Sequence, residues 1–160
     1  MTDDDEVTIV ELEKMKVMGM RRTGEYKIIS EMLPALYEYA ISNGIQVSGP
    51  AIFVCHESSK EEMEKAMAEK NADVECAIPV LSDDVKPGES MSVYDLPAAK
   101  MARIVHKGPY EECEKAYAKL MTWLGQNNKK IVGPMREHYL NDPREVPPEE
   151  ILTEIYAPIE

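Results

Sequence analysis

The chain repeats its glycine-containing turn motifs at an offset of 84 residues. Gly24-Glu25-Tyr26 aligns with Gly108-Pro109-Tyr110, and Gly49-Pro50 aligns with Gly133-Pro134. Between these marks each copy has apolar residues at helical spacing, and after Gly-Pro each copy has a strand-like stretch. A chain of 160 residues has room for two such small units sharing one core. This repeat constrains the fold more than any other feature of the sequence.

The pattern predicts strand, helix, strand and strand in each copy. We expect helices over 27–42, 59–71 and 109–127, and strands over 7–20 (continuous or broken by a bend), 47–55, 74–80, 90–95, 98–107, 132–140 and 151–157. Pro34 lies inside the first helical pattern, where it should start or kink the main helix. We therefore predict an α+β fold of duplicated βαββ units, with a mainly antiparallel sheet and two long helices on one face.

The domain organisation follows from the same alignment. Residues 1–6 form an acidic start that we expect to be disordered. Residues 7–160 form one domain, in which the first repeat covers about 7–82 and the second about 88–160.

The composition excludes several classes of function. With 18 basic and 30 acidic residues the net charge is −12, which disfavours direct binding of nucleic acid. No apolar stretch is long enough to span a membrane and no secretion signal opens the chain, so we expect a cytoplasmic protein. The three histidines, His56, His106 and His138, lack the spacing of a metal site, and we expect no metal and no cofactor.

The two copies differ in the strand after Gly-Pro. Side chains alternate in a strand, so Met135, Glu137 and Tyr139 share one face. Phe53 occupies the position of Glu137 in the first copy. A carboxylate among such neighbours needs a partner or a ligand cation, or else its pKa rises. Strand parity alone slightly favours a solvent-facing or ion-paired Glu137 over a ligand site.

Aromatic side chains are the other candidates for ligand contacts. Trp123 and Tyr39 occupy matching helix positions, where they line opposite walls of a cleft or simply pack in the core. Tyr156, on the last strand, is a further ligand candidate, whereas Tyr110 at a helix start is expected to be structural. Aromatic faces attract cations by about 0.5–2 kcal/mol per contact.

The ordered motifs of the second copy resemble one known family. Lys107-Gly108-Pro109-Tyr110, Gly133-Pro134, the run from Arg136 to Pro143 and the closing Thr153–Ile159 are similar to those of GyrI-like small-molecule-binding domains. These are also the effector-binding domains of some AraC-type and MerR-type regulators. The resemblance implies two βαββ units related by a pseudo-twofold axis, a ligand cleft between their helices, and Glu137 as its buried carboxylate.

Three functions follow from the resemblance. The leading one is a binding protein for small lipophilic, cationic or aromatic molecules, with contacts from Glu137, Tyr139, Phe53, Trp123, Tyr39, Tyr156 and Met135. The second is a hydrolase of reactive cyclopropane-bearing genotoxins, in which Glu137 is the general base and Tyr139 assists. The third is a protein-interaction role, such as the modulation of gyrase or of a separate regulator.

Overall fold

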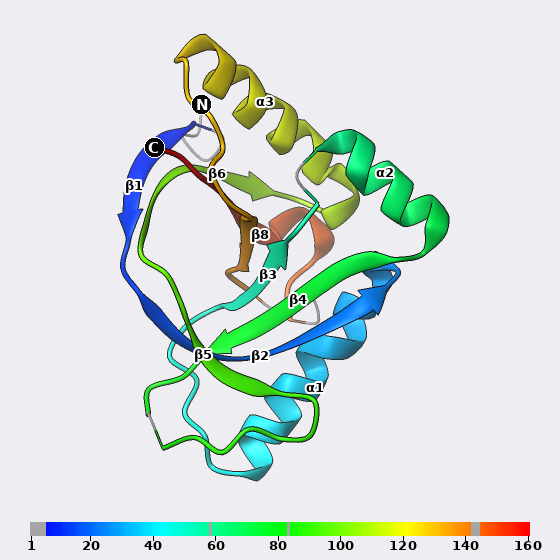
Figure 1. The fold of residues 1–160 in the computed structure, drawn as a ribbon, viewed down its shortest axis with the longest axis vertical. Helices are drawn as coiled ribbons and strands as arrows, with labels where there is room; N and C mark the ends of the chain where they lie inside the picture. Colours follow the sequence, from blue (N-terminus) through cyan, green and yellow to red (C-terminus); the bar gives the residue numbers. More distant parts are fainter. Residues whose placement is uncertain (1–5, 58, 83, 142–144) are drawn as a thin grey trace. The chain divides into compact units, whose positions relative to one another are not determined.

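The computed structural model describes residues 6–57, 59–82, 84–141 and 145–160. The chain divides into two compact units (Figure 1). The first unit is Lys14–Pro97, and the second combines Met1–Glu13 with Ala98–Glu160. Both units contain helices and antiparallel strands, which confirms the predicted α+β class. The acidic start predicted to be disordered lies, apart from Glu6, outside the described residues.

The first unit is a four-stranded sheet with two helices. Its elements in chain order are β2 (Met15–Gly24), the 3-10 turn η2 (Tyr26–Ile28), α1 (Ile29–Ser42), β3 (Ala51–Cys55), α2 (Lys60–Glu69), β4 (Ala72–Pro79) and β5 (Ser92–Leu96). The strands pair in the order β3-β4-β2-β5. The predicted insert helix at 59–71 is α2, and the Ser59 hydroxyl caps it by accepting a bond from Glu62 N at 3.1 Å.

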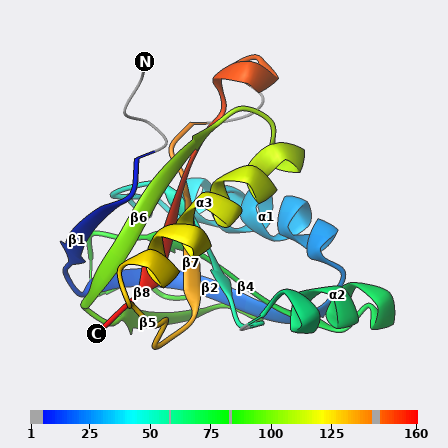
Figure 2. The same ribbon diagram turned by 90° about the horizontal axis from the view of Figure 1, so that it is seen from above.

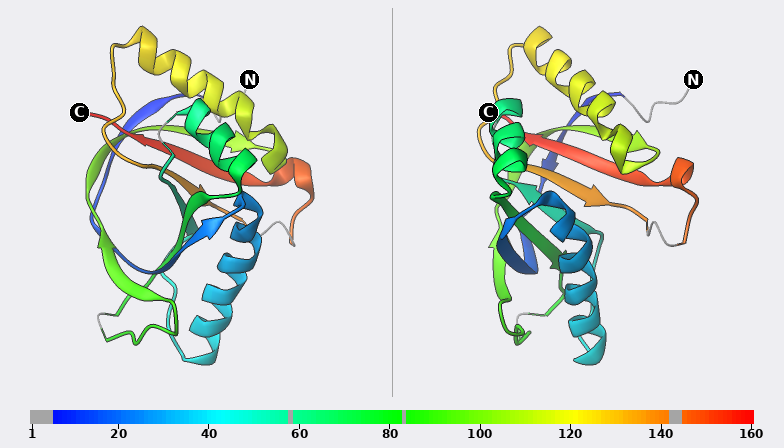
Figure 3. Two further views of the ribbon diagram at one scale, coloured as in Figure 1. Left: turned by 45° about the vertical axis from the view of Figure 1, so that its right-hand side comes forward. Right: turned by 90° about the vertical axis from the view of Figure 1, so that its right-hand side faces the viewer.

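Helix α1 lies against β4 and β2 (Figure 3). It packs there through one apolar face. Met32, Leu36 and Ala40 are buried at four-residue spacing, which places them on the same side of the helix. The helix begins at Ile29, so Pro34 lies inside it. The alternative in which Pro34 starts the helix is therefore wrong. The side-chain amide of Asn43 bonds Tyr39 O at 2.8 Å where the helix ends.

The second unit is also a four-stranded sheet, with one α-helix, α3. Its elements are β1 (Thr8–Leu12), β6 (Ala99–Lys107), the 3-10 turn η3 (Tyr110–Glu112), α3 (Cys113–Gln126), β7 (Met135–Tyr139), the 3-10 turn η4 (Pro148–Glu150) and β8 (Leu152–Pro158). The strands pair in the order β1-β6-β8-β7 (Figure 2). The third predicted helix thus starts with a 3-10 turn after Pro109 before it becomes α-helical.

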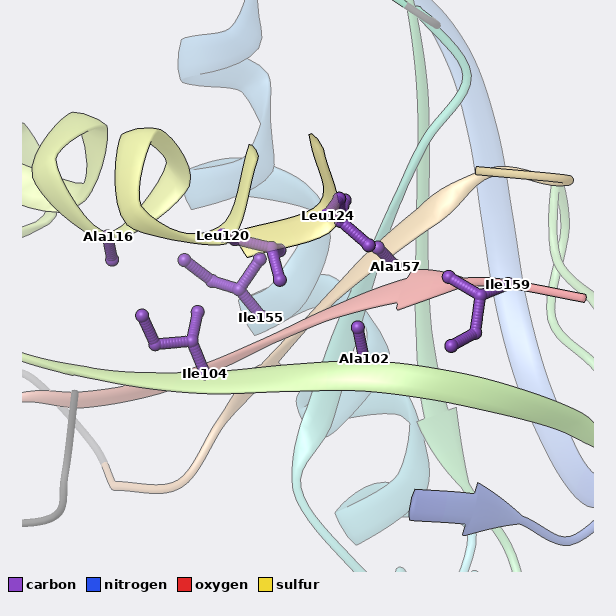
Figure 4. Packing of buried hydrophobic residues seen from close by; sticks show 8 residues of the cluster. All are labelled: Ala102, Ile104, Ala116, Leu120, Leu124, Ile155, Ala157 and Ile159. Carbon is purple, nitrogen blue, oxygen red and sulfur yellow. The ribbon is translucent and has the colours of Figure 1, made fainter. Parts of the chain in front are cut away.

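The core of the second unit lies between α3 and its sheet. Leu120 and Leu124 of α3 point toward Ile155 and Ala157 of β8, and Ile104 of β6 completes the layer (Figure 4). All five side chains are almost fully excluded from solvent. A buried leucine or isoleucine contributes about 1.5–3 kcal/mol of transfer free energy, so this layer fixes α3 on the sheet.

Both units end their long helix in the same way. Ile45 N bonds Ala40 O at 2.9 Å in the first unit, and 84 positions later Lys129 N bonds Leu124 O at 2.9 Å. The order β2-α1-β3-β4 of the first unit matches β6-α3-β7-β8 of the second, except that α2 stands between β3 and β4. Two strands lie outside the sequence-based repeat boundaries. β1 pairs with β6 and clusters with the second unit, whereas β5 pairs with β2 and clusters with the first. The duplication as an origin of these likenesses stays a prediction.

Cys55, Cys76 and Cys113 are buried thiols. In the described part of the chain no helix has the length and apolarity to cross a membrane.

Candidate functional site

Strand β7 places Glu137 on the face of its sheet that carries α3. Glu137 lies opposite Ile155 in the register, and directly opposite residues of antiparallel strands share a face. Ile155 belongs to the core beneath α3, so Glu137 points to that side. Arg136 and His138 alternate to the other face, as strand parity predicts.

The carboxylate of Glu137 accepts hydrogen bonds from two phenols. Tyr139 donates from Oη to Glu137 Oε1 at 2.9 Å, and Tyr117 of α3 donates a short bond to Oε2. One oxygen is thus held from the same strand and the other from the helix above it. Bonds of this kind to a charged acceptor contribute about 1.5–3 kcal/mol each.

Three further side chains surround this carboxylate-phenol cluster. The ring of Tyr110, at the start of η3, meets the edge of Tyr139 with centroids 5.6 Å apart. His106 and Thr153 are neighbours across β6 and β8, and Thr153 lies opposite Tyr139. His106 donates from Nε2 to Pro109 O at 3.0 Å, because a carbonyl oxygen only accepts. We call Glu137, Tyr117, Tyr139, Tyr110 and His106 the Glu137 cluster.

Burial raises the pKa of Glu137 above its ordinary value of 4.5. The residue as a whole keeps some exposure, while its carboxyl group is desolvated beneath the phenols. The bonds from Tyr117 and Tyr139 and the nearby His106 act in the opposite direction, since each favours the ionised form. Desolvation is the larger effect, so Glu137 holds its proton to higher pH than an exposed glutamate.

The arrangement offers two kinds of chemistry. A cation that enters beside Glu137 would supply the charge that burial withholds, and tyrosine rings attract cations through their faces. A carboxyl with a raised pKa is also suited to accept a proton from water near neutral pH. The geometry therefore supports a cation site and contains the groups for acid–base chemistry.

Trp123 does not reach the Glu137 cluster. It follows Tyr117 by six residues, which places the two side chains roughly 120° apart around α3. The buried row of Ala116, Leu120 and Leu124 lies between them. Tyr117 leans over β7, whereas Trp123 lines a hollow together with Val7 before β1. The two rings therefore occupy opposite flanks of the helix.

Two predicted ligand residues lie in the first unit. Phe53 is buried and meets the ring of Tyr26 edge-on with centroids 6.3 Å apart. Tyr39 donates from its hydroxyl to Lys86 O at 2.7 Å, and its ring fills the space where a side chain at Gly88 would stand. Their part in ligand binding stays a prediction.

The last two predicted ligand residues are Met135, which lies on the same face as Glu137, and Tyr156, which does not. Met135 shares the α3 face of β7 and packs against the core of the second unit. Tyr156 lies opposite Arg136, on the other face, and its ring is 4.6 Å from that of His138. The pairing register thus separates Tyr156 from Glu137, which strand position alone does not reveal.

Sequence reasoning overlooked Tyr117 and His106 and assigned Tyr110 a structural role. Tyr117 fits the apolar stripe of its helix, so its pattern predicts core packing. A signal was available in the repeat, because the residues 84 positions before Tyr117 and His106 are Leu33 and Arg22. The copies therefore differ at these two positions, as they do at Glu137, where the matching residue is Phe53.

A second buried carboxylate, Glu75 of β4, went unnoticed in the sequence. It accepts a bond from the Tyr94 hydroxyl at 2.6 Å and contacts His56 Nε2 at 2.6 Å. A Cβ at Gly19 would stand 2.2 Å from the Tyr94 hydroxyl, so glycine makes room for this contact. Both oxygens of Glu75 are engaged, which fits a buried polar network of the first unit. Among the described residues no group of three or more ligating side chains could hold a metal.

The family model of the GyrI-like small molecule binding domain matches residues 5–160. No curated protein sequence shows a significant match. Among solved structures, the EcmrR C-terminal domain has a TM-score of 0.83 and 23% identity, covering 97% of this chain and 97% of that one. In the EcmrR–DNA complex the TM-score is 0.83 at 22% identity, over 97% of this chain, which spans only 57% of the EcmrR chain.

Two more distant structures share the fold. SAV2435, solved with bound tetraphenylphosphonium, has a TM-score of 0.62 and 15% identity over 97% of this chain and 94% of its own. A hydrolase from Listeria innocua has a TM-score of 0.67 and 13% identity over 98% of this chain and 93% of its own. At these identities the likeness concerns the fold alone. The family match over nearly the whole chain carries the assignment: the protein belongs to the GyrI-like small-molecule-binding domains.

Proposed function

We propose that the second unit binds small lipophilic cations, with Glu137 as the buried carboxylate that meets the positive charge. The observation that carries this proposal is the desolvated carboxyl held by Tyr117 and Tyr139. A cation restores the electrostatic stabilisation that Glu137 loses by burial, and this favours ionisation and binding together. SAV2435, which shares the fold, binds such a cation, tetraphenylphosphonium, and this supports the choice of ligand class.

The aromatic neighbours define what else the ligand carries. Tyr110 and Tyr139 meet edge to face, and Tyr117 approaches from α3, so a bound molecule would meet ring faces and edges. These surfaces favour flat or lipophilic groups around the charge, and they set few directional demands. We therefore expect a tolerant site that selects charge and lipophilicity more than shape.

Calorimetric titration with tetraphenylphosphonium tests this function. Glu137→Gln should weaken binding by about tenfold or more, because it removes the charge and keeps the size of the side chain. Glu64→Gln is the matched control, since it removes the same charge from an exposed position on α2 of the first unit. If both variants bind as the unaltered protein does, or if the protein binds no lipophilic cation, the proposal is wrong.

A hydrolase is the second candidate, and the raised pKa of Glu137 favours it. Glu137 would take a proton from water, and a tyrosine hydroxyl would donate to the leaving group. Tyr117 and Tyr139 both donate to Glu137, so one phenol must turn toward the substrate during the reaction. Turnover of a cyclopropane-bearing electrophile that is lost in Glu137→Gln would support catalysis. Tight binding with the electrophile left intact would restrict the protein to binding.

A further inference from the structure

Strand β1 offers a free backbone edge. Among the described strands it pairs on one side only, with β6. Its five residues, Thr8–Leu12, contain no proline and no lysine, the residues that commonly protect such an edge. The outer N–H and C=O groups of β1 are therefore able to pair with another extended chain.

Ile9 of β1, and Val7 just before the strand, stand on the face that carries α3. Ile9 lies opposite Ala102, which belongs to the core beneath the helix, and Val7 packs against that core. Ile9 is nonetheless 44% exposed, a high value for a large apolar side chain on a covered face. This side of β1 has room for an additional apolar group.

A hollow of about 420 Å³ lies between this end of the sheet and α3. It is lined by Val7, Ala118, Lys119, Thr122, Trp123 and Gln126. The five helical residues recur at three- and four-residue spacing, so they form one wall along α3. We call the hollow together with the free edge of β1 the β1–α3 groove.

The form of the groove suits a chain more than an enclosed small molecule. Ala118, Lys119, Thr122 and Gln126 are exposed, so the hollow is open along its helical wall. An extended peptide beside β1 would place alternate side chains toward α3, at the spacing that a strand imposes. One apolar side chain of that peptide would enter the hollow against Trp123 and Val7.

Charge distinguishes the possible occupants. Exposed Glu6, Glu11 and Glu13 lie in or beside β1, where an added strand would run, and the whole chain carries a net charge of −12. The exposed lysines of the region lie further from that edge or at its end: Lys100 on β6, Lys119 on α3 and Lys14 after β1. A second copy of this chain would bring the same glutamates against them, which is repulsive. A basic segment would instead gain from their field.

We propose that the β1–α3 groove docks an extended, basic peptide segment of a partner protein. The segment adds a strand to β1 through main-chain hydrogen bonds and inserts one apolar side chain beside Trp123, a mode known for other helix-and-edge-strand grooves. Trp123 and Tyr117 lie on opposite flanks of α3, so this surface is distinct from the Glu137 cluster.

An octapeptide of alternating valine and lysine, with a fluorescent label, is the probe. Its anisotropy gives the affinity, and the indole N–H signal of Trp123, the only tryptophan, reports where it binds. Ile9→Lys should weaken binding by about tenfold, because it places a positive charge on β1 beside the basic peptide and removes an apolar contact. Val132→Lys adds the same charge at another exposed apolar residue, 55% exposed, and should have a much smaller effect.

Two further peptides separate strand pairing from simple charge attraction. An octapeptide of the same sequence, N-methylated along one edge, keeps every charge and should lose binding, since it cannot pair with β1. The valine–glutamate octapeptide should not bind. Equal binding of the methylated peptide, equal effects of the two lysine variants, or an unmoved Trp123 signal would overturn the proposal. So would a dimer that Ile9→Lys dissociates, because a second copy would then occupy the groove.

Discussion

Acid should destabilise this protein partly through His138. Burial, with Arg136 and Arg103 nearby, lowers the pKa of His138 from 6.5 to about 4, although Glu154 acts in the opposite direction. The unfolded chain therefore takes up a proton near pH 6.5, whereas the folded protein resists it until about pH 4. Stability is lost as the pH falls through this window and is fully present above it.

The size of the effect follows from the shift. A difference of about 2.5 pKa units at about 1.4 kcal/mol each gives at most about 3.5 kcal/mol. About 3 kcal/mol of this is lost between pH 7 and pH 4, because at pH 4 the folded protein itself holds the proton half of the time. Urea denaturation at a series of pH values measures it. Other groups titrate in the same window, so the informative quantity is the difference between the unaltered protein and a variant that cannot titrate there.

His138→Phe is such a variant, because it keeps a ring beside Tyr156. Its stability should fall less steeply on acidification, by about 3 kcal/mol over the window. Its absolute stability at pH 7 can differ in either direction without affecting the test. Parallel curves for the two proteins would refute the reasoning, since His138 would then titrate alike in the folded and unfolded states.

Three other predictions concern the two buried carboxylates. Glu137→Gln should raise the melting temperature at pH 8, and the gain should vanish toward acid pH. The reason is that burial raises the pKa of Glu137, so the ionised glutamate destabilises the folded protein as the pH rises. An equal effect at all pH values would contradict this. Tyr117→Phe should weaken tetraphenylphosphonium binding at neutral pH by about tenfold and raise the pKa of Glu137 further, since it removes a donor to the charged form, as a titration of affinity against pH would show. Gly19→Ala should destabilise the first unit by about 1–3 kcal/mol in urea denaturation, because its methyl would stand 2.2 Å from the Tyr94 hydroxyl. Tyr94→Phe should relieve part of that loss, and no relief would show that the clash is not with the phenol.

Local patterns predicted the elements of the fold well. The apolar spacing of α1 and α3 and the Ser59 cap of α2 identify these helices because helical periodicity and capping act over a few residues. The place of β1 was not predictable in this way. Its pairing with β6 joins residues about ninety positions apart, and no local signal encodes that choice of partner.

The site was predicted in part for a similar reason. The comparison of the two copies singled out Glu137 as a carboxylate opposite Phe53, but strand parity alone slightly favoured a solvent-facing or ion-paired side chain. Only the resemblance to GyrI-like domains made it the expected buried carboxylate. Tyr117 was missed because its position reads equally well as core packing, and only the register of α3 over β7 reveals the bond. Trp123 was grouped with Glu137 because matching positions were compared without asking which flank of the helix each residue occupies.

The ionisation of Glu137 with and without a lipophilic cation is the most direct test of the central claim. Carbon NMR of glutamate side-chain carboxyls, with Glu137→Gln to assign the signal, follows this group through a pH titration. We predict a midpoint above the ordinary value of 4.5 in the free protein and a shift to lower pH when tetraphenylphosphonium is bound. An ordinary midpoint that the cation leaves unchanged would contradict the account.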